Sequence, residues 1–377
     1  MISRASEAKG TYNAKNVWLA LIPAAVLFGC IWSSTDISSI DKCPKATYFR
    51  PVWSADGTSI YYEWDIYLPT QEESEDDGVR VIDTDGKNDR LLYKWARPGQ
   101  LSPDGKMMLY IPGGFYAVGA YDYKILDLAT LQTRELLTRR SGAVWSPDSQ
   151  WILSASERED GSLTKTNALT GESIDLTDGR SKNSWPLWSL DGKTILFQSD
   201  MDNDLNSFYT MDASGGAITR TKISAPAACA SPHKYGGDFL LSVLPDGKTL
   251  ATQYECNYYT RLRTIGLDGT EVNDLSGLGY ISESVTNEIE AKWSPDGTKI
   301  LFIRFNDGNL TVADPDGTHV RVLRDSDVYS FAWSPDSSRV AFAGEDAAGL
   351  SEIFTVRPDG TDLQQVTQNP YIGQTCP

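Results

Sequence analysis

The hydrophobic pattern of the chain is a repeat of two short apolar strands joined by a polar turn. It is clearest in residues 292–304, which read Lys-Trp-Ser-Pro-Asp-Gly-Thr-Lys-Ile-Leu-Phe-Ile-Arg. In the turn, Pro295 presets φ, Asp296 bonds to nearby backbone, and Gly297 accepts a positive φ without strain. The following strand is apolar on both faces, so both faces are predicted to be covered. The pattern therefore predicts a strand, a type I turn with a left-handed fourth position, and a second strand.

Versions of this turn recur along the chain. Their spacing is 40 to 55 residues, close to the roughly 40–45 residues that four short strands and their turns require. Each copy is therefore predicted to be one blade of a β-propeller spanning residues 51–367. The seven copies begin at Trp53, Leu101, Trp145, Trp188, Val243, Trp293 and Trp333.

A second signal follows most copies: a third strand, an Asp/Gly turn and a fourth strand that ends in Leu-Thr or a relative of it. Residues 311–317 and 365–367 are examples. A four-stranded blade has two apolar faces and cannot bury them alone, so the blades must stack around an axis. The predicted fold is all-β, a propeller most consistent with seven four-stranded blades. The fifth repeat departs most from the pattern, because Val243-Leu244 replaces Trp-Ser.

The Trp-Ser-Pro-Asp-Gly motifs resemble the WD-like repeats of the TolB family of periplasmic bacterial envelope proteins, and similar propellers attached to some serine peptidases. The resemblance covers residues 51–367. It implies a propeller fold and a binding role in the envelope. TolB proteins have a separate α/β domain before a six-bladed propeller, whereas this chain has seven motifs that begin soon after an N-terminal apolar segment.

The N-terminus has the features of an export signal. Residues 1–16 are polar and mostly basic, and residues 17–28 are an uninterrupted apolar run of 12 residues. That run is short for a membrane span, which needs about 20 residues. It leads into Leu-Phe-Gly-Cys30, which looks like the site where a bacterial lipoprotein is cut and acylated. The alternatives are an uncleaved signal anchor reaching Trp32, or ordinary cleavage. Residues 1–29 are thus predicted to be a signal peptide or anchor, and residues 30–50 a tether.

The cysteines agree with an extracytoplasmic, membrane-anchored location, in a periplasm or at a cell surface. Once Cys30 is assigned to lipidation, four cysteines remain, and an even number can pair. Cys43 lies just before the first blade and Cys376 lies in the closing tail, residues 368–377, so a bridge between them is predicted to close the ring. Cys229 and Cys256 both lie in the fifth repeat and are left to pair with each other. Buried free thiols are the alternative.

The charge excludes one class of partner. The formal net charge is −17, and loss of residues 1–29 removes three bases and one acid, which leaves −19. Nucleic acid is therefore not expected to bind. The acidity fits either simple solubility or a cationic ligand, and a monomeric propeller is expected.

Loop lengths indicate which rim binds. In an antiparallel blade the first-to-second and third-to-fourth turns share one rim, and these are the short motifs; the other connections share the opposite rim. Long segments at residues 67–78, 113–120, 200–207, 225–237 and 276–288 fall on that second rim, where binding is expected. On that rim, residues 72–77 form an acidic run that follows several aromatic residues. This run could bind a basic peptide or a cation, or it could be only solvated. The candidate binding residues are Tyr67, Glu72, Glu73, Glu75, Asp76, Asp77, Phe115, Tyr116 and His233.

Asp200, Asp202 and Asp204 alternate as in a calcium loop, yet the Gly and the later Glu of the helical calcium motif are missing. They are weak candidates for Ca²⁺, and no other cofactor is expected. The tryptophans of the repeat slot are interpreted as inter-blade packing rather than a sugar platform.

Catalysis has little support in the sequence. There are two histidines, His233 and His319, and neither a Gly-x-Ser-x-Gly elbow nor a pair of histidines at metal-ligand spacing. We therefore predict a non-enzymatic binding or scaffold propeller, tethered to the membrane, that takes a protein partner or another envelope ligand on the long-loop rim. The alternative is a hydrolase or lyase acting on a polysaccharide or peptide at the ring axis through paired carboxylates.

Overall fold

The structure is a computed structural model of the full chain. It describes residues 45–67, 76–113, 122–136, 140–156, 161–202, 207–223, 238–256, 259–278, 291–304, 307–325 and 328–370. By its contacts the chain divides into two units, Met1–Ile40 and Asp41–Pro377. The first unit, with the predicted signal segment and Cys30, lies outside the described residues.

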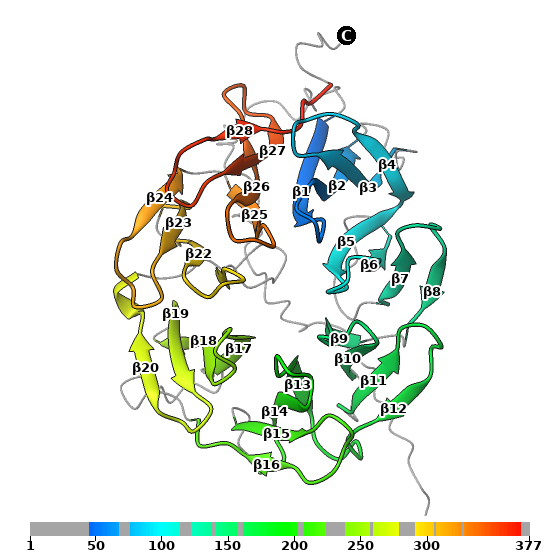
Figure 1. Ribbon diagram of the computed structural model, residues 1–377, viewed down its shortest axis with the longest axis vertical. Helices are drawn as coiled ribbons and strands as arrows, with labels where there is room; N and C mark the ends of the chain where they lie inside the picture. The colour runs from blue at the N-terminus through cyan, green and yellow to red at the C-terminus, as the bar shows by residue number, and fades with distance from the viewer. Residues whose placement is uncertain are drawn as a thin grey trace, which may run out of the picture. The chain divides into compact units, whose positions relative to one another are not determined.

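The second unit is a ring of seven four-stranded antiparallel sheets, each built from four consecutive strands (Figure 1). The predicted seven-bladed propeller is thus confirmed, and the irregular fifth repeat forms all four of its strands. The first strand begins at Lys45, ahead of the predicted start of the propeller at residue 51. A 3₁₀ turn, η2, covers Ser276–Leu278.

The blades are numbered in chain order, four strands to a blade. Their strands are, for blade 1, β1 (Lys45–Trp53), β2 (Ser59–Tyr67), β3 (Gly78–Asp83) and β4 (Arg90–Lys94); for blade 2, β5 (Ala96–Leu101), β6 (Met107–Pro112), β7 (Lys124–Asp127) and β8 (Thr133–Glu135); for blade 3, β9 (Arg140–Trp145), β10 (Trp151–Ser156), β11 (Leu163–Asn167) and β12 (Ser173–Asp175); for blade 4, β13 (Asn183–Trp188), β14 (Thr194–Ser199), β15 (Ser207–Asp212) and β16 (Thr219–Arg220); for blade 5, β17 (Asp238–Val243), β18 (Thr249–Cys256), β19 (Tyr259–Gly266) and β20 (Glu271–Asp274); for blade 6, β21 (Ala291–Trp293), β22 (Ile300–Ile303), β23 (Leu310–Ala313) and β24 (Arg321–Arg324); and for blade 7, β25 (Val328–Trp333), β26 (Val340–Glu345), β27 (Ser351–Val356) and β28 (Gln364–Gln365).

All seven motif turns adopt the predicted conformation. Their fourth residue has a positive φ of 61° to 71°, including Ser149 and Ser337, which replace glycine. In the turn of blade 6 the Asp296 carboxylate accepts bonds from Ser294 Oγ (2.6 Å) and from the Thr298 backbone N–H (2.9 Å). The Asp carboxylates are thus bound within their own turns, which makes this rim regular and self-contained.

The two serines at a left-handed position also link blades. Ser149 Oγ accepts a bond from the Asp104 N–H (3.0 Å), and Ser337 Oγ accepts one from the Asp296 N–H (3.1 Å). In each case the donor belongs to the turn of the preceding blade. The hydroxyl therefore offsets part of the strain that a side chain meets at positive φ.

Some of the repeated tryptophans are hydrogen-bonded to the blade before their own. The indole N–H of Trp145 donates to Gln100 O (3.1 Å), and that of Trp333 donates to Lys292 O (3.0 Å). In both pairs the acceptor immediately precedes the slot residue of the preceding blade. Trp145 and Trp333 are 5% and 8% exposed, so the predicted packing role is confirmed for them. The buried indole N–H groups of Trp188 and Trp293 have no partner among the described residues.

The apolar core of the described residues consists of seven separate clusters, and each cluster lies between two neighbouring blades. β22 shows why: its four residues are all buried, with Leu301 and Ile303 facing blade 7 and Ile300 and Phe302 facing blade 5. Burial of both faces of a blade therefore depends on having a neighbour on each side.

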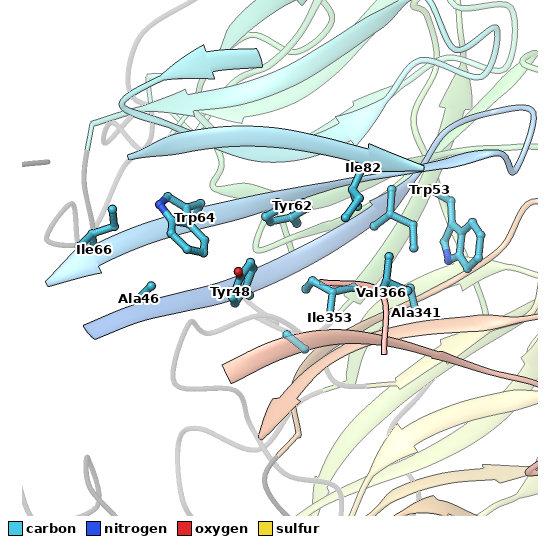
Figure 2. Packing of buried hydrophobic residues seen from close by; sticks show 12 residues of the cluster. Ala46, Tyr48, Trp53, Tyr62, Trp64, Ile66, Ile82, Ala341, Ile353 and Val366 are labelled. Atoms are coloured by element: carbon cyan, nitrogen blue, oxygen red, sulfur yellow. The ribbon is translucent and has the colours of Figure 1, made fainter. Parts of the chain in front are cut away.

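The seam between blades 1 and 7 closes without exchange of a strand, because β28 supplies the fourth strand of blade 7. Figure 2 shows the apolar contact, with Tyr48 and Trp53 of blade 1 near Ile353 and Val366 of blade 7. Polar bonds reinforce it. Ser351 Oγ accepts from the Tyr48 N–H (3.0 Å) and donates to Tyr48 O (3.1 Å), and Trp53 Nε1 donates to Ala332 O (3.2 Å).

A buried carboxylate holds the segment after β28 at this seam. Glu352 is 0% exposed and accepts bonds from Thr367 Oγ1 (2.6 Å) and from the Asn369 N–H (2.7 Å). The Asn369 side-chain amide donates to Ala46 O of blade 1 (3.2 Å). The ring therefore has a non-covalent closure. The predicted bridge between Cys43 and Cys376 lies outside the described residues and stays a prediction, as does the pairing of Cys229, also outside them, with Cys256, whose side chain is not described.

Ser337→Ala is expected to lower the free energy of unfolding by about 1 kcal/mol, because the inter-blade bond is lost while the left-handed backbone still carries a Cβ. Ser337→Gly also loses the bond but relieves the strain, so it should lie closer to wild type. Urea denaturation of the three proteins measures the order. Equal losses in both variants would show that backbone strain plays no part at this turn.

Glu352→Gln tests the closure. Burial raises the pKa of Glu352, so the folded state binds its proton more tightly than the unfolded chain does. Its contribution to stability is therefore fully present below the unfolded pKa and is lost as the pH rises through the folded pKa. Urea denaturation from pH 4 upwards should show wild type losing stability relative to Glu352→Gln across that window. The exposed Glu172→Gln is the control, and its difference from wild type should not follow this course.

Candidate functional site

The strand topology places the long connections on one rim. The five long segments of the sequence all join a second strand to a third or a fourth strand to the next blade, and the strand ends that flank them lie opposite the motif turns. Among the described residues of this rim are the last residues of β4, the first residues of β5 and the residues just before β3. We define the long-loop rim as this edge of the ring and the short-turn rim as the edge formed by the motif turns.

Only part of the predicted rim set is described. Asp77 lies just before β3, where its Oδ1 accepts the Ile66 N–H (2.8 Å) and its backbone O accepts the Trp95 N–H (2.8 Å). Asp76 is exposed. Tyr67 ends β2, and its side chain is not described. The remaining candidates lie outside the described residues: Glu72, Glu73, Glu75, Phe115, Tyr116 and His233.

The two described members of the calcium candidate have separate partners. Asp200 Oδ1 accepts the Lys182 N–H (2.8 Å), whereas Asp202 Oδ2 accepts the Tyr209 hydroxyl (2.8 Å) and lies 3.4 Å from an Arg220 nitrogen. Asp204 lies outside the described residues. Within the part of the chain that the structure describes, no group of three or more His, Cys, Asp or Glu side chains could hold a metal ion.

Trp95 is the feature of this rim that sequence reasoning missed. It is 43% exposed and is the one aromatic among the exposed large hydrophobic residues of the described chain. It stands between β4 and β5, outside the repeat slot that buries other tryptophans. The signal available in the sequence was a large apolar residue at a connection where the pattern expects a polar turn.

The backbone at Trp95 is left-handed, with φ of 49°. This conformation is a genuine outlier for a bulky residue and costs of order 1–3 kcal/mol. Two bonds fix it: the Trp95 N–H donates to Asp77 O and Trp95 O accepts the Gly113 N–H, each at 2.8 Å. Gly78 also packs tightly here, since a Cβ on it would lie 2.2 Å from Tyr93 O. The exposed indole is therefore carried on a firmly held backbone.

Two residues further along, Arg97 belongs to a buried ion-pair cluster. Arg97 Nε lies 3.2 Å from Glu63 Oε1, and Arg50 Nη1 lies 3.4 Å from Glu63 Oε2. The three side chains are between 7% and 12% exposed. Arg50 has a φ of 52° at a bulge of β1, which disturbs the pairing of that strand with β2. The cluster joins β1 and β2 of blade 1 to β5 of blade 2.

Aromatic residues lie beside this cluster on the inner strands. β1, β5 and β25 are among the strands nearest the ring centre in Figure 1. The rings of Phe49, on β1, and Tyr329, on β25, are 5.7 Å apart. The Tyr329 hydroxyl donates to Glu345 Oε1. Phe49 pairs across the strands with Glu63, so blades 7, 1 and 2 bring aromatic, acidic and basic groups together at the inner edge of the ring.

His319 occupies the opposite, short-turn rim. Its Nδ1 is 2.7 Å from Asp314 Oδ2, and its side chain is 80% exposed. The Lys299 ammonium also pairs with Asp314. The pKa of Asp314 is lowered, chiefly by the Lys299 bond and then by His319. Asp314 thus serves as a shared acceptor for two basic side chains.

No family model and no curated protein sequence matches the chain. Solved structures do. The β-propeller domain of the Trilobed protease from Pyrococcus furiosus, described as having an open velcro topology, is 17% identical with a TM-score of 0.60 over 88% of this chain and 99% of that one. An oligogalacturonate lyase in complex with manganese is 15% identical with a TM-score of 0.59, over 83% and 90%.

A TolB structure from Acinetobacter baumannii also matches, at 16% identity and a TM-score of 0.47, over 84% of this chain and 78% of that one. The other similarities, below 25% identity, show the fold alone. The comparisons therefore support the β-propeller fold of this chain and do not identify its activity.

Glu63→Ala is expected to lower the free energy of unfolding by about 3–5 kcal/mol, because Arg50 and Arg97 stay buried and lose the carboxylate they share. Chemical denaturation measures the loss. Asp85→Ala is the matched control, since the pair of Asp85 with Lys87 is 57% and 75% exposed and its removal should change stability little. A loss at Glu63 no larger than the loss at Asp85 would contradict a structural role for the cluster.

Proposed function

We propose that the protein is a non-enzymatic binding propeller that holds a protein partner or another envelope ligand on the long-loop rim. One observation carries this proposal: the exposed Trp95 stands on that rim on a backbone fixed by bonds to Asp77 and Gly113. Exposed aromatic residues on rigid supports are common anchors of interfaces.

The short-turn rim offers a contrast that supports the same choice. Its Asp side chains accept bonds from their own turns, and the Ser54 bond, the largest cause, lowers the pKa of Asp56, as the Ser334 bond does for Asp336. These carboxylates are already occupied by local donors. The long-loop rim is the one that varies between blades, and variable connections on a rigid ring are suited to recognition.

The proposed location is extracytoplasmic, with attachment to a membrane through lipidated Cys30 or through an uncleaved anchor at residues 17–28. Both lie outside the described residues. Among the residues that are described, no helix is long and apolar enough to cross a membrane. Support comes from the apolar run before Cys30 and from the resemblance of the repeats to periplasmic TolB proteins.

A second candidate is a hydrolase or lyase that acts on a polysaccharide or peptide at the ring axis. Glu63 and Glu345, both on second strands, favour it, because they lie beside the aromatic pair of Phe49 and Tyr329. Both carboxylates already serve structural partners. Glu345→Gln separates the two candidates, since it should abolish turnover by an enzyme and leave binding on the rim unchanged.

Site-directed photo-crosslinking in the full chain tests the proposed function. A benzoylphenylalanine at position 76 on the long-loop rim should give a discrete ultraviolet-dependent adduct, because a bound partner covers this residue. The matched control is position 169, since Leu169 is 63% exposed on the short-turn rim. Adducts at position 169 with none at position 76 would reject the assignment of the rim.

A further inference from the structure

We propose that Trp95 is the anchor for a lysine- or arginine-rich segment of a partner protein. This inference rests on the proposed binding role of the long-loop rim and names the chemistry of its ligand. It is carried by three observations on the described residues: the exposure of the indole, the cost of the backbone that presents it, and the charges around it.

The backbone conformation at Trp95 is one that asparagine or glycine adopts more easily than tryptophan. A buried tryptophan at such a position would be explained by packing. This indole is 43% exposed, so packing recovers only part of what its burial could provide. The bonds from Trp95 to Asp77 and Gly113 keep the indole on the rim in spite of the strain.

The surroundings favour a cation on the indole face. The Lys94 ammonium lies over the Trp95 ring, 5.9 Å from its centre, which shows that the face accepts a positive charge. Asp76 is exposed close by in sequence to Asp77, which bonds Trp95. The net charge of −17 adds a long-range attraction for a basic partner.

Lys94 therefore has a defined role in this arrangement. In the free protein its ammonium occupies the indole face that the side chain of a partner takes in the complex. Removal of Lys94 should strengthen binding, since the internal competitor is lost along with a repulsive charge.

Fluorescence anisotropy with a labelled nona-arginine peptide tests the inference on the whole chain. Trp95→Asn replaces the indole with a side chain that tolerates the left-handed backbone. It should weaken binding about five- to tenfold, consistent with loss of a cation–π contact. Lys94→Ala should tighten binding at least twofold. Thermal unfolding of Trp95→Asn should give a Tm no lower than wild type, because strain is relieved.

The control is Leu169→Asn, a change of an exposed apolar residue on the short-turn rim, which should leave the affinity for nona-arginine unchanged. Equal affinities of wild type and Trp95→Asn would overturn the inference by showing that only the overall acidity attracts the peptide. Binding of uncharged oligosaccharides that depends on Trp95, with none of nona-arginine, would overturn it as well. Neither result would bear on the crosslinking test at position 76. The proposed binding role of the rim and the proposed basic ligand of Trp95 can therefore be rejected independently.

Discussion

Each blade exposes two apolar faces, and no blade can bury both without a neighbour on each side. The seven core clusters that the described residues form all lie between blades. The indole N–H groups of Trp53, Trp145 and Trp333 add hydrogen bonds between neighbours, since each donates to a backbone oxygen of the adjacent inner strand. Every later feature, including the rim, depends on closure of this ring.

The seam shows how closure is achieved when no strand is exchanged. Blade 1 meets blade 7 through an apolar cluster, through Ser351 on the backbone of Tyr48, and through the segment held by Glu352. The buried position of Glu352 disfavours its charged form, and burial accordingly raises the pKa of this carboxyl. Its acceptance of two donors explains how it is tolerated.

The two rims follow from the same ring and differ in chemistry. The polar side chains of the motif turns bond within their own turns, so the geometry of these turns repeats from blade to blade. Just before β5, by contrast, Trp95 has a strained left-handed backbone and its indole is exposed to solvent. Strain that the surrounding bonds hold in place is a feature typical of recognition sites. The rigidity of the ring thus allows one rim to carry residues that do not serve the core.

The sequence by itself determined the number of blades, the left-handed turns and the packing role of the repeated tryptophans. These are local properties: a two-residue period, a Pro-Asp-Gly turn and a spacing near that of four strands encode them. It did not predict the contact of Glu63 with Arg97, of Phe49 with Tyr329, or of Tyr48 with Ser351, which are 303 residues apart. The first of these contacts forms when blade 2 packs on blade 1, and the other two form only once blade 7 meets blade 1. The presentation of Trp95 was likewise decided by the tertiary structure, because bonds from two other connections hold its backbone in place.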